Sequence, residues 1–140
     1  MFFLNKMKKE LEKEQDEIID FAITAYKRYR RLEIEKKTGG KRSIHHPSAK
    51  LKLFQKYISK EIFLTLPVHK SVFSYRKNLS IKDLANLHKK NRYLLRIDFK
   101  DFFPSIRGEN IRLFLKNTDL NLNDLEITLI NLLVCKNLIK

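Results

Sequence analysis

The stretch LLRIDFKDFFPSIR, from Leu94 to Arg107, places two carboxylates among apolar residues. Apolar residues are dense from Tyr93 to Phe99, which predicts a strand buried on both faces, and Pro104 ends regular structure beyond it. Asp98 lies at the end of this strand, where a carboxylate is unfavourable unless it is paired, hydrogen-bonded or bound to a metal ion. Magnesium, which prefers oxygen ligands, is one candidate partner. A hydrogen bond to the following turn is the alternative.

The residues after Asp98 carry a weaker signal of chemistry. Asp101 precedes Pro104 closely enough to accept backbone N–H groups in a turn. Phe102 and Phe103 are aromatic residues of the kind that more often fill a core than touch a ligand. Taken by themselves, these residues leave both a structural and a functional interpretation open.

The positive charge of the chain is concentrated in its middle. The 140 residues carry a formal net charge of +14 and are 43% hydrophobic, which fits one domain with a core. Residues 21–70 contain thirteen basic and three acidic residues, whereas residues 1–20 contain four and six. Such a patch favours a polyanion such as nucleic acid, because neutralising phosphates releases condensed counterions. A solvated basic surface is the alternative.

Cysteine usage and hydropathy favour a cytoplasmic location. Cys135 is the one cysteine, so no disulfide forms within the chain, and its apolar neighbours predict a buried structural thiol. The apolar opening is too short for a signal peptide, and no run approaches the length of a membrane span. We therefore expect no membrane partner.

The periodicity of apolar residues predicts a mixed α+β chain. A hairpin is expected over residues 31–46, where residues alternate on both sides of Thr38-Gly39-Gly40. The helix after Pro47 and Ser48 places Leu51, Phe54, Ile58 and Ile62 on one stripe, and Ser80 with Asp83 predicts a capped helix from Ile81 to about Lys89. Other helices are expected over residues 5–30, as one or two helices, and over 108–117 and 123–137.

The predicted hairpin turn has the sequence KKTGGKR, which suits an anion. The glycines let the backbone approach a ligand, and Lys41 and Arg42 can grip phosphate. It is not a P-loop, because Glu35 stands where that motif needs glycine and Arg42 where it needs serine or threonine.

Three segments in this order resemble bacterial reverse transcriptases of the retron type: KKTGGKRSIHHPSAKLKLFQKYI, the helix SIKDLANLH, and LLRIDFKDFFPSI. The resemblance runs from about Tyr26 to the end of the chain and implies a right-hand polymerase, mostly helical with a β-hairpin and a palm strand. Residues 1–30 would form an N-terminal helical segment, 31–92 the fingers, and 93–140 a partial palm. Leu84 stands where the retron pattern usually has asparagine, so a group II intron-like or phage-defence enzyme is the alternative subtype.

The resemblance also assigns roles to the candidate residues. Asp98 would be the catalytic residue that binds two Mg²⁺ ions, with the backbone carbonyl of Phe99 completing the coordination. Lys41 and Arg42 would clamp the incoming dNTP, and Asp101 would lie beside its triphosphate. Phe103 would pack under the sugar and so favour deoxynucleotides.

The implied function is RNA-directed DNA polymerisation, the two-metal transfer of dNTPs onto a DNA or RNA primer on an RNA template. The Y-x-D-D segment that completes the metal site in the family is absent from these residues, so we expect no polymerisation without the remaining C-terminal part of the polymerase. A non-catalytic RNA-binding module and a scaffold for a defence partner protein are the alternatives.

Overall fold

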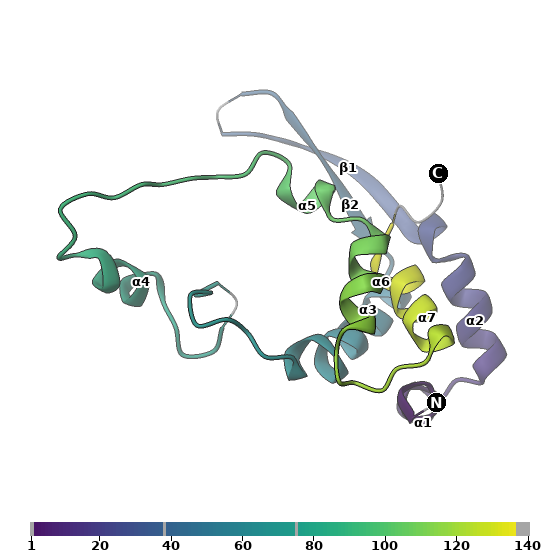
Figure 1. Ribbon diagram of the computed structural model, residues 1–140. Helices are drawn as coiled ribbons and strands as arrows, with labels where there is room; N and C mark the ends of the chain where they lie inside the picture. Colours follow the sequence, from purple (N-terminus) through teal and green to yellow (C-terminus); the bar gives the residue numbers. More distant parts are fainter. Residues whose placement is uncertain (1, 38, 75, 137–140) are drawn as a thin grey trace.

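The computed structural model describes residues 2–37, 39–74 and 76–136, and its elements are shown in Figure 1. The described residues form a mixed chain of seven α-helices and a two-stranded antiparallel sheet, which confirms the α+β prediction. The order is α1 (Phe2–Leu11), α2 (Gln15–Ile23), the 3-10 helix η1 (Ala25–Arg28), β1 (Tyr29–Glu35), β2 (Lys41–Pro47), α3 (Ala49–Glu61), the 3-10 helix η2 (Phe63–Thr65), α4 (Ile81–His88), α5 (Phe102–Ser105), α6 (Gly108–Lys116) and α7 (Asp124–Val134).

Five helices, α1, α2, α3, α6 and α7, share one hydrophobic core. The stripe predicted for the helix after Pro47 is confirmed, because all four of its members are buried: Leu51, Phe54, Ile58 and Ile62. The apolar side chains of α7 complete this core from the other end of the chain. Burying such side chains is the main favourable term that holds the helices together.

Local capping sets where several helices begin. The Ser48 side chain accepts a hydrogen bond from the backbone of Leu51 at 3.3 Å, which starts α3. Ser80 and Asp83 form a capping box at the start of α4, as the sequence predicts. Glu12 adopts a positive φ of 51° between α1 and α2, so the predicted N-terminal helical region is two helices.

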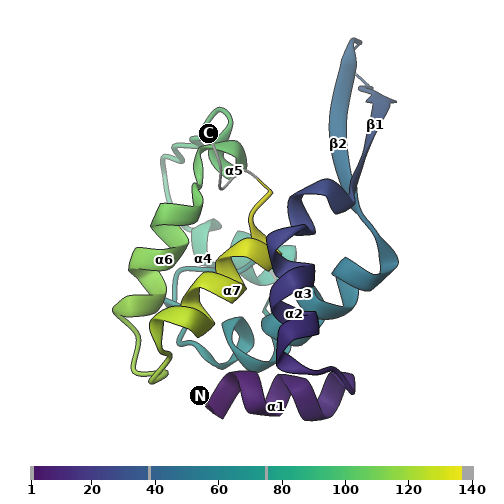
Figure 2. The ribbon, with the colours of Figure 1, turned by 90° about the vertical axis from the view of Figure 1, so that its right-hand side faces the viewer.

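The hairpin projects from the core (Figure 2), and Tyr29 at its base is held by α3, while η1, which leads into it, packs on α2 and α7. Gln55 of α3 donates to the Tyr29 hydroxyl at 2.8 Å and to the carbonyl oxygen of Leu133 at 2.9 Å. The guanidinium carbon of Arg28 lies 4.1 Å from the centre of the Phe21 ring, which suits a cation–π contact. The hairpin is therefore anchored at its base while its strands are exposed.

The chain between η2 and α6 leaves the core as a long loop, called the arc here (residues 67–74 and 76–107), which carries α4 and α5 (Figure 1). Almost all of its described side chains are exposed. The predicted buried strand at residues 93–99 is wrong: this segment forms no strand and is exposed throughout. A strand needs backbone partners along its length, and β1 and β2, the only strands in the described chain, pair with each other.

The end of the last helix also differs from the prediction. Helix α7 stops at Val134 instead of extending to residue 137, which lies outside the described residues. Cys135 follows the helix and is half-buried, and burial raises the pKa of its thiol. Of the helices in the described residues, not one has the length and apolar character needed to cross a membrane.

Candidate functional site

The strongest candidate site is the hairpin tip (residues 34–37 and 39–42), where the turn brings basic residues together. Gly39 and Gly40 have φ values of 87° and 81°, in the left-handed region that glycine adopts readily. The amide of Lys36 donates to the carbonyl oxygen of Gly40 at 2.9 Å, and the amide of Gly39 donates to that of Lys36 at 3.0 Å. These bonds close the turn and fix which residues lie beside it.

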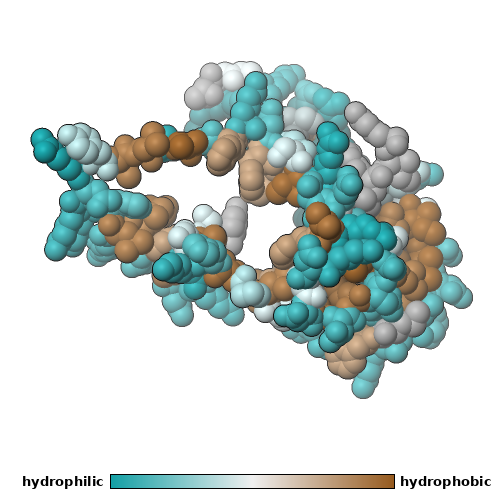
Figure 3. All heavy atoms as spheres, viewed as in Figure 1, coloured by the Kyte–Doolittle hydropathy of each residue, from teal (hydrophilic) through white to brown (hydrophobic). Residues whose placement is uncertain are grey.

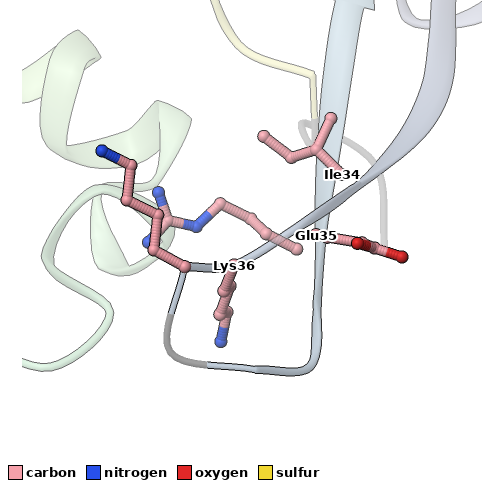
Figure 4. Close-up of a pocket in the computed structure, with 5 residues that line it drawn as sticks. Ile34, Glu35 and Lys36 are labelled. Carbon is pink, nitrogen blue, oxygen red and sulfur yellow. The ribbon is translucent and has the colours of Figure 1, made fainter.

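An open pocket of about 310 Å³ lies at this tip (Figure 4), and the described residues that line it all belong to the hairpin: Ile34, Glu35, Lys36, Lys37 and Arg42. Three of its five residues are cations and one is an anion, so the pocket carries a net positive charge. Figure 4 shows the side chains of Glu35, the last residue of β1, and of Lys36, which follows it, pointing in different directions. Lysine and arginine donors around an open pocket suit a phosphate group.

The structure separates Lys41 from Arg42, the two basic residues that the resemblance assigned to the triphosphate. Ile34 pairs with Arg42, and Glu35 pairs with Lys41, so Arg42 and Lys41 lie on opposite faces of the hairpin. Arg42 lines the pocket, whereas the Lys41 ammonium lies 3.6 Å from a carboxylate oxygen of Glu33. Arg42 is therefore one of the described residues that line the pocket, and Lys41 is not.

Lys36 and Lys37 are site residues that sequence reasoning did not single out. Both belong to the quoted turn KKTGGKR, so the signal was present in the sequence. A two-stranded register had to be known before either lysine could be placed beside Arg42. The pocket depends on that register, because a shift by one residue would move Arg42 to the other face.

Asp98 and Phe99 lie in the exposed arc, outside regular structure. The Phe99 side chain is 72% exposed, and its ring centre lies 6.5 Å from that of Phe102. The sequence argument for a metal ion at Asp98 assumes that its carboxylate is buried, whereas the structure shows Asp98 exposed. Figure 2 shows the hairpin standing clear of α5, and no arc residue lines the tip pocket.

Asp101 and Phe103 lie at the short helix α5. Asp101 precedes α5 with a positive φ of 53°, and its carbonyl oxygen accepts from the amide of Ser105 at 3.0 Å. Phe103 is 73% exposed and meets Phe102 edge to face, with ring centres 5.4 Å apart. A left-handed backbone at a non-glycine residue is uncommon and is often found at functional turns.

The metal-binding prediction can be tested against the donors present. The Asp98 carboxylate and the Phe99 carbonyl are oxygen donors of the kind that Mg²⁺ prefers. In the described part of the chain, no group of three or more histidine, cysteine, aspartate or glutamate side chains is placed to hold a metal ion. The donors are therefore right in kind and too few in number for a metal site made by these residues alone.

Comparison with known proteins gives the evolutionary context. The chain is 48% identical over 80 residues to the retron Ec73 reverse transcriptase of Escherichia coli, a match that covers 56% of this chain and 25% of the relative. This chain is related to the retron reverse transcriptases. It is also 34% identical over 90 residues to the Ec86 enzyme of E. coli, covering 63% of this chain and 28% of the relative. The retron Mx65 reverse transcriptase of Myxococcus xanthus is 34% identical over 79 residues, covering 56% of this chain and 18% of the relative. No family model matches the chain.

The similarity to these relatives confirms the resemblance to retron reverse transcriptases that the sequence motifs suggest. The retron type is the subtype that these three relatives carry in their names, although Leu84 departs from the usual retron pattern. The match spans about a quarter of the length of the two E. coli relatives. The matched region is therefore only a part of each of these relatives.

Proposed function

We propose that this chain is the N-terminal part of an RNA-directed DNA polymerase that uses dNTPs, a primer and an RNA template. The observation that carries the proposal is the tip pocket, where Arg42, Lys36 and Lys37 meet. The relationship to retron reverse transcriptases supports the choice of a nucleotide as the ligand. Residues 31–92 would form the fingers and residues 93–140 part of the palm, with residues 1–30 as a helical support.

The tip pocket would bind the triphosphate of the incoming dNTP. The guanidinium group of Arg42 can make two parallel hydrogen bonds to phosphate oxygens, while Lys36 and Lys37 act as point charges. Lys41 would join them only by leaving Glu33 and reaching around the hairpin. We therefore rank Arg42 above Lys41 as the main contact.

Asp98 would be the catalytic carboxylate of this part of the polymerase. Asp98 and the Phe99 carbonyl would hold Mg²⁺ together with carboxylates from the remaining C-terminal part of the enzyme. When bound, the ions would activate the primer hydroxyl and offset charge on the attacking and leaving oxygens. Asp101 would lie beside the triphosphate, and Phe103 would pack under the sugar and disfavour a 2′-hydroxyl.

The exposed apolar residues of the arc favour contact with a further polypeptide. Figure 3 shows hydrophobic side chains gathered along the loop between α4 and α5. Five of them are between 67% and 82% exposed: Tyr93, Leu94, Leu95, Ile97 and Phe99. A contiguous apolar surface of this kind marks an interaction site. The C-terminal part of the polymerase would cover it and supply the strand partners that residues 93–99 lack.

Primer extension tests the proposal. The chain is mixed with, or joined to, a polypeptide that supplies the Y-x-D-D segment, and dNTP incorporation on an RNA template is measured with Mg²⁺. Asp98→Ala removes several kcal/mol of transition-state stabilisation, which corresponds to a rate loss of about a thousandfold or more. Asp119→Ala is the matched control, because Asp119 is also an exposed aspartate. Undiminished incorporation by Asp98→Ala would refute the catalytic assignment.

The same assay separates the roles of Arg42 and Lys41. Hydrogen bonds to charged groups contribute about 1.5 to 3 kcal/mol, so Arg42→Gln should raise the KM for dNTP by about 10-fold to 150-fold. Lys41→Gln removes the same charge from the opposite face and should change KM much less. Equal effects of the two substitutions would contradict the assignment of the tip pocket to the triphosphate.

A non-catalytic RNA-binding module is the second candidate, favoured by the excess of ten positive charges in residues 21–70 (thirteen basic, three acidic). Such a module would bind RNA without regard to Mg²⁺ or to Asp98. RNA binding unchanged by Asp98→Ala, together with no incorporation in the complemented assay, would favour it. A role in phage defence, or as a scaffold for a defence partner, would follow from the family resemblance and is tested by co-purification. The cytoplasmic location expected from cysteine usage and hydropathy is tested by fractionation of cells.

A further inference from the structure

Helix α3 carries a row of lysines along the middle of its exposed face. Lys52, Lys56 and Lys60, called the lysine row here, are spaced four residues apart. Each step advances about 6 Å along the helix axis and rotates by about 40°, so the three side chains follow one another on one side. The opposite side of α3 is buried in the core through Leu51 and Ile58.

The lysine row is electrostatically unfavourable within the chain itself. Like charges four residues apart on a helix destabilise it by a few tenths of a kcal/mol per pair. Among the ion pairs of the described residues, Lys60 is 3.2 Å from Glu61, whereas Lys52 and Lys56 have no carboxylate partner. Glu61 is itself shared with Lys6. The charges of Lys52 and Lys56 are therefore not offset by a carboxylate among the described residues.

The lysine row continues onto one face of the hairpin. The Lys52 ammonium lies 3.0 Å from Nε2 of His46, and His46 pairs across the sheet with Arg30. Residues on this face alternate along the strands: the Arg30–His46 pair is followed by Leu32 opposite Ile44 and then by Ile34 opposite Arg42. The row thus leads from α3 across the hairpin base to the face that carries Ile34 and Arg42, two of the residues that line the tip pocket.

Apolar side chains accompany this basic track. Leu53 of α3 is 59% exposed, and Leu32 and Ile44 of the hairpin are each 38% exposed. Proteins that follow a single nucleic-acid strand combine a basic groove for the backbone with aromatic side chains on which the bases stack. This track supplies the basic groups, and its leucine and isoleucine side chains offer apolar contact instead of stacking.

We propose that the lysine row, with His46 and Arg30, binds the phosphate backbone of a single nucleic-acid strand at a site separate from the tip pocket. The choice of nucleic acid over other polyanions rests on the proposed function. An anionic membrane suits the row less well, because helices that lie on membranes bury their apolar face in lipid, and the apolar face of α3 is buried in the protein core.

Salt-dependent binding tests this site without any polymerase activity. The 140-residue chain is titrated into a fluorescent 20-nucleotide oligo(U), and anisotropy is followed at several KCl concentrations. Each phosphate contact with a single strand contributes about 0.7 to the slope of log K against log salt, so Lys52→Gln/Lys56→Gln should reduce the slope by about 1.4. Taking the two lines to meet at 1 M salt, the affinity at 0.1 M should fall about 25-fold.

The matched control is Lys9→Gln/Lys13→Gln, which removes the same charge from the acidic N-terminal region. It should leave the slope nearly unchanged. Equal losses in the two double variants would show that net charge alone is measured and would overturn the site, as would an unchanged slope in Lys52→Gln/Lys56→Gln. Lys56→Gln alone, expected to reduce the slope by about 0.7, serves if the double variant fails to fold.

Two further arms separate this inference from its neighbours. In the first, vesicles of phosphatidylserine replace the RNA. If Lys52→Gln/Lys56→Gln binds these vesicles less well than the parent but binds RNA equally well, the proposal is overturned in favour of a membrane surface. Asp98→Ala should leave RNA binding unchanged, because Asp98 is not part of the track. The polymerisation assay can therefore fail while Lys52 and Lys56 are still shown to bind RNA. Equally, the RNA-binding prediction can fail while the complemented enzyme remains active.

Discussion

Glu126 offers the sharpest test of how the N-terminal helix is held. This carboxylate is only 1% exposed, and it accepts two backbone hydrogen bonds. One oxygen accepts from the amide of Leu4 in the first turn of α1 at 2.9 Å, and the other accepts from the amide of Asn123 at the start of α7 at 3.1 Å. One side chain therefore caps two helices, and its negative charge also suits both helix N-termini.

The magnitude follows from these two bonds. A hydrogen bond to a charged group contributes about 1.5 to 3 kcal/mol, and the Leu4 amide would be left buried without a partner. Glu126→Ala should therefore lower the free energy of unfolding by about 3 to 5 kcal/mol, a large part of the 5 to 15 kcal/mol typical of a domain. Glu126→Gln keeps one acceptor oxygen and should lose about 1.5 to 3 kcal/mol.

Urea unfolding followed by circular dichroism measures both losses. The control is Glu109→Gln, which makes the same chemical change at an exposed position in the first turn of α6 and should stay within about 0.5 kcal/mol of the parent. Hydrogen exchange should show α1 losing protection first in Glu126→Gln. If Glu126→Gln and Glu109→Gln unfold at the same urea concentration, the double-capping argument is refuted.

Three further predictions concern the core, the stability at acid pH and the arc. Ile58→Ala should lower the free energy of unfolding by about 2 to 5 kcal/mol, because Ile58 is fully buried; a urea midpoint equal to that of the parent would contradict this. The hydrogen bond from Lys6 lowers the pKa of Glu61 from its ordinary 4.5, so its stabilisation is present above about pH 4.5 and is lost as the pH falls further. Glu61→Gln should therefore make the melting temperature depend less on pH in that acid range. If the melting temperature of Glu61→Gln falls with pH as steeply as that of the parent, the Lys6–Glu61 pair does not contribute. Ser80→Ala removes a cap of about 1 kcal/mol from the exposed helix α4, so chemical shifts should show less helix there while global unfolding stays the same; a loss of global stability would mean that α4 packs on the core.

The elements that could be predicted from sequence are those specified locally. Leu51, Phe54 and Ile58 repeat at helical spacing, and Ser48 supplies a cap at the correct position, so α3 needs no distant information. The hairpin is equally local, because alternation on both strands meets at two glycines with positive φ. For the same reason Arg42 could be proposed as an anion contact before its surroundings were known.

The strand predicted at residues 93–99 shows the limit of this reasoning. Its apolar residues favour burial in a sheet, yet a strand exists only when another backbone offers N–H and C=O groups along its length. The described chain provides no such partner, so the segment forms no strand and is exposed. The apolar composition of a segment indicates that it favours a buried strand, whereas the pairing of that strand with another depends on the rest of the fold.

Most of the helices, the hairpin and the resemblance to reverse transcriptases could be predicted from sequence, because each depends on residues close together in the chain or on their order. Helix α5, which contains Pro104, was not predicted. The tertiary structure decided which groups meet. It placed Arg42 with Lys36 and Lys37 and set Lys41 on the other face. It also brought Glu126 to the amide of Leu4, 122 residues away. Distances of this kind depend on the packing of whole elements, and no local pattern of residues encodes them.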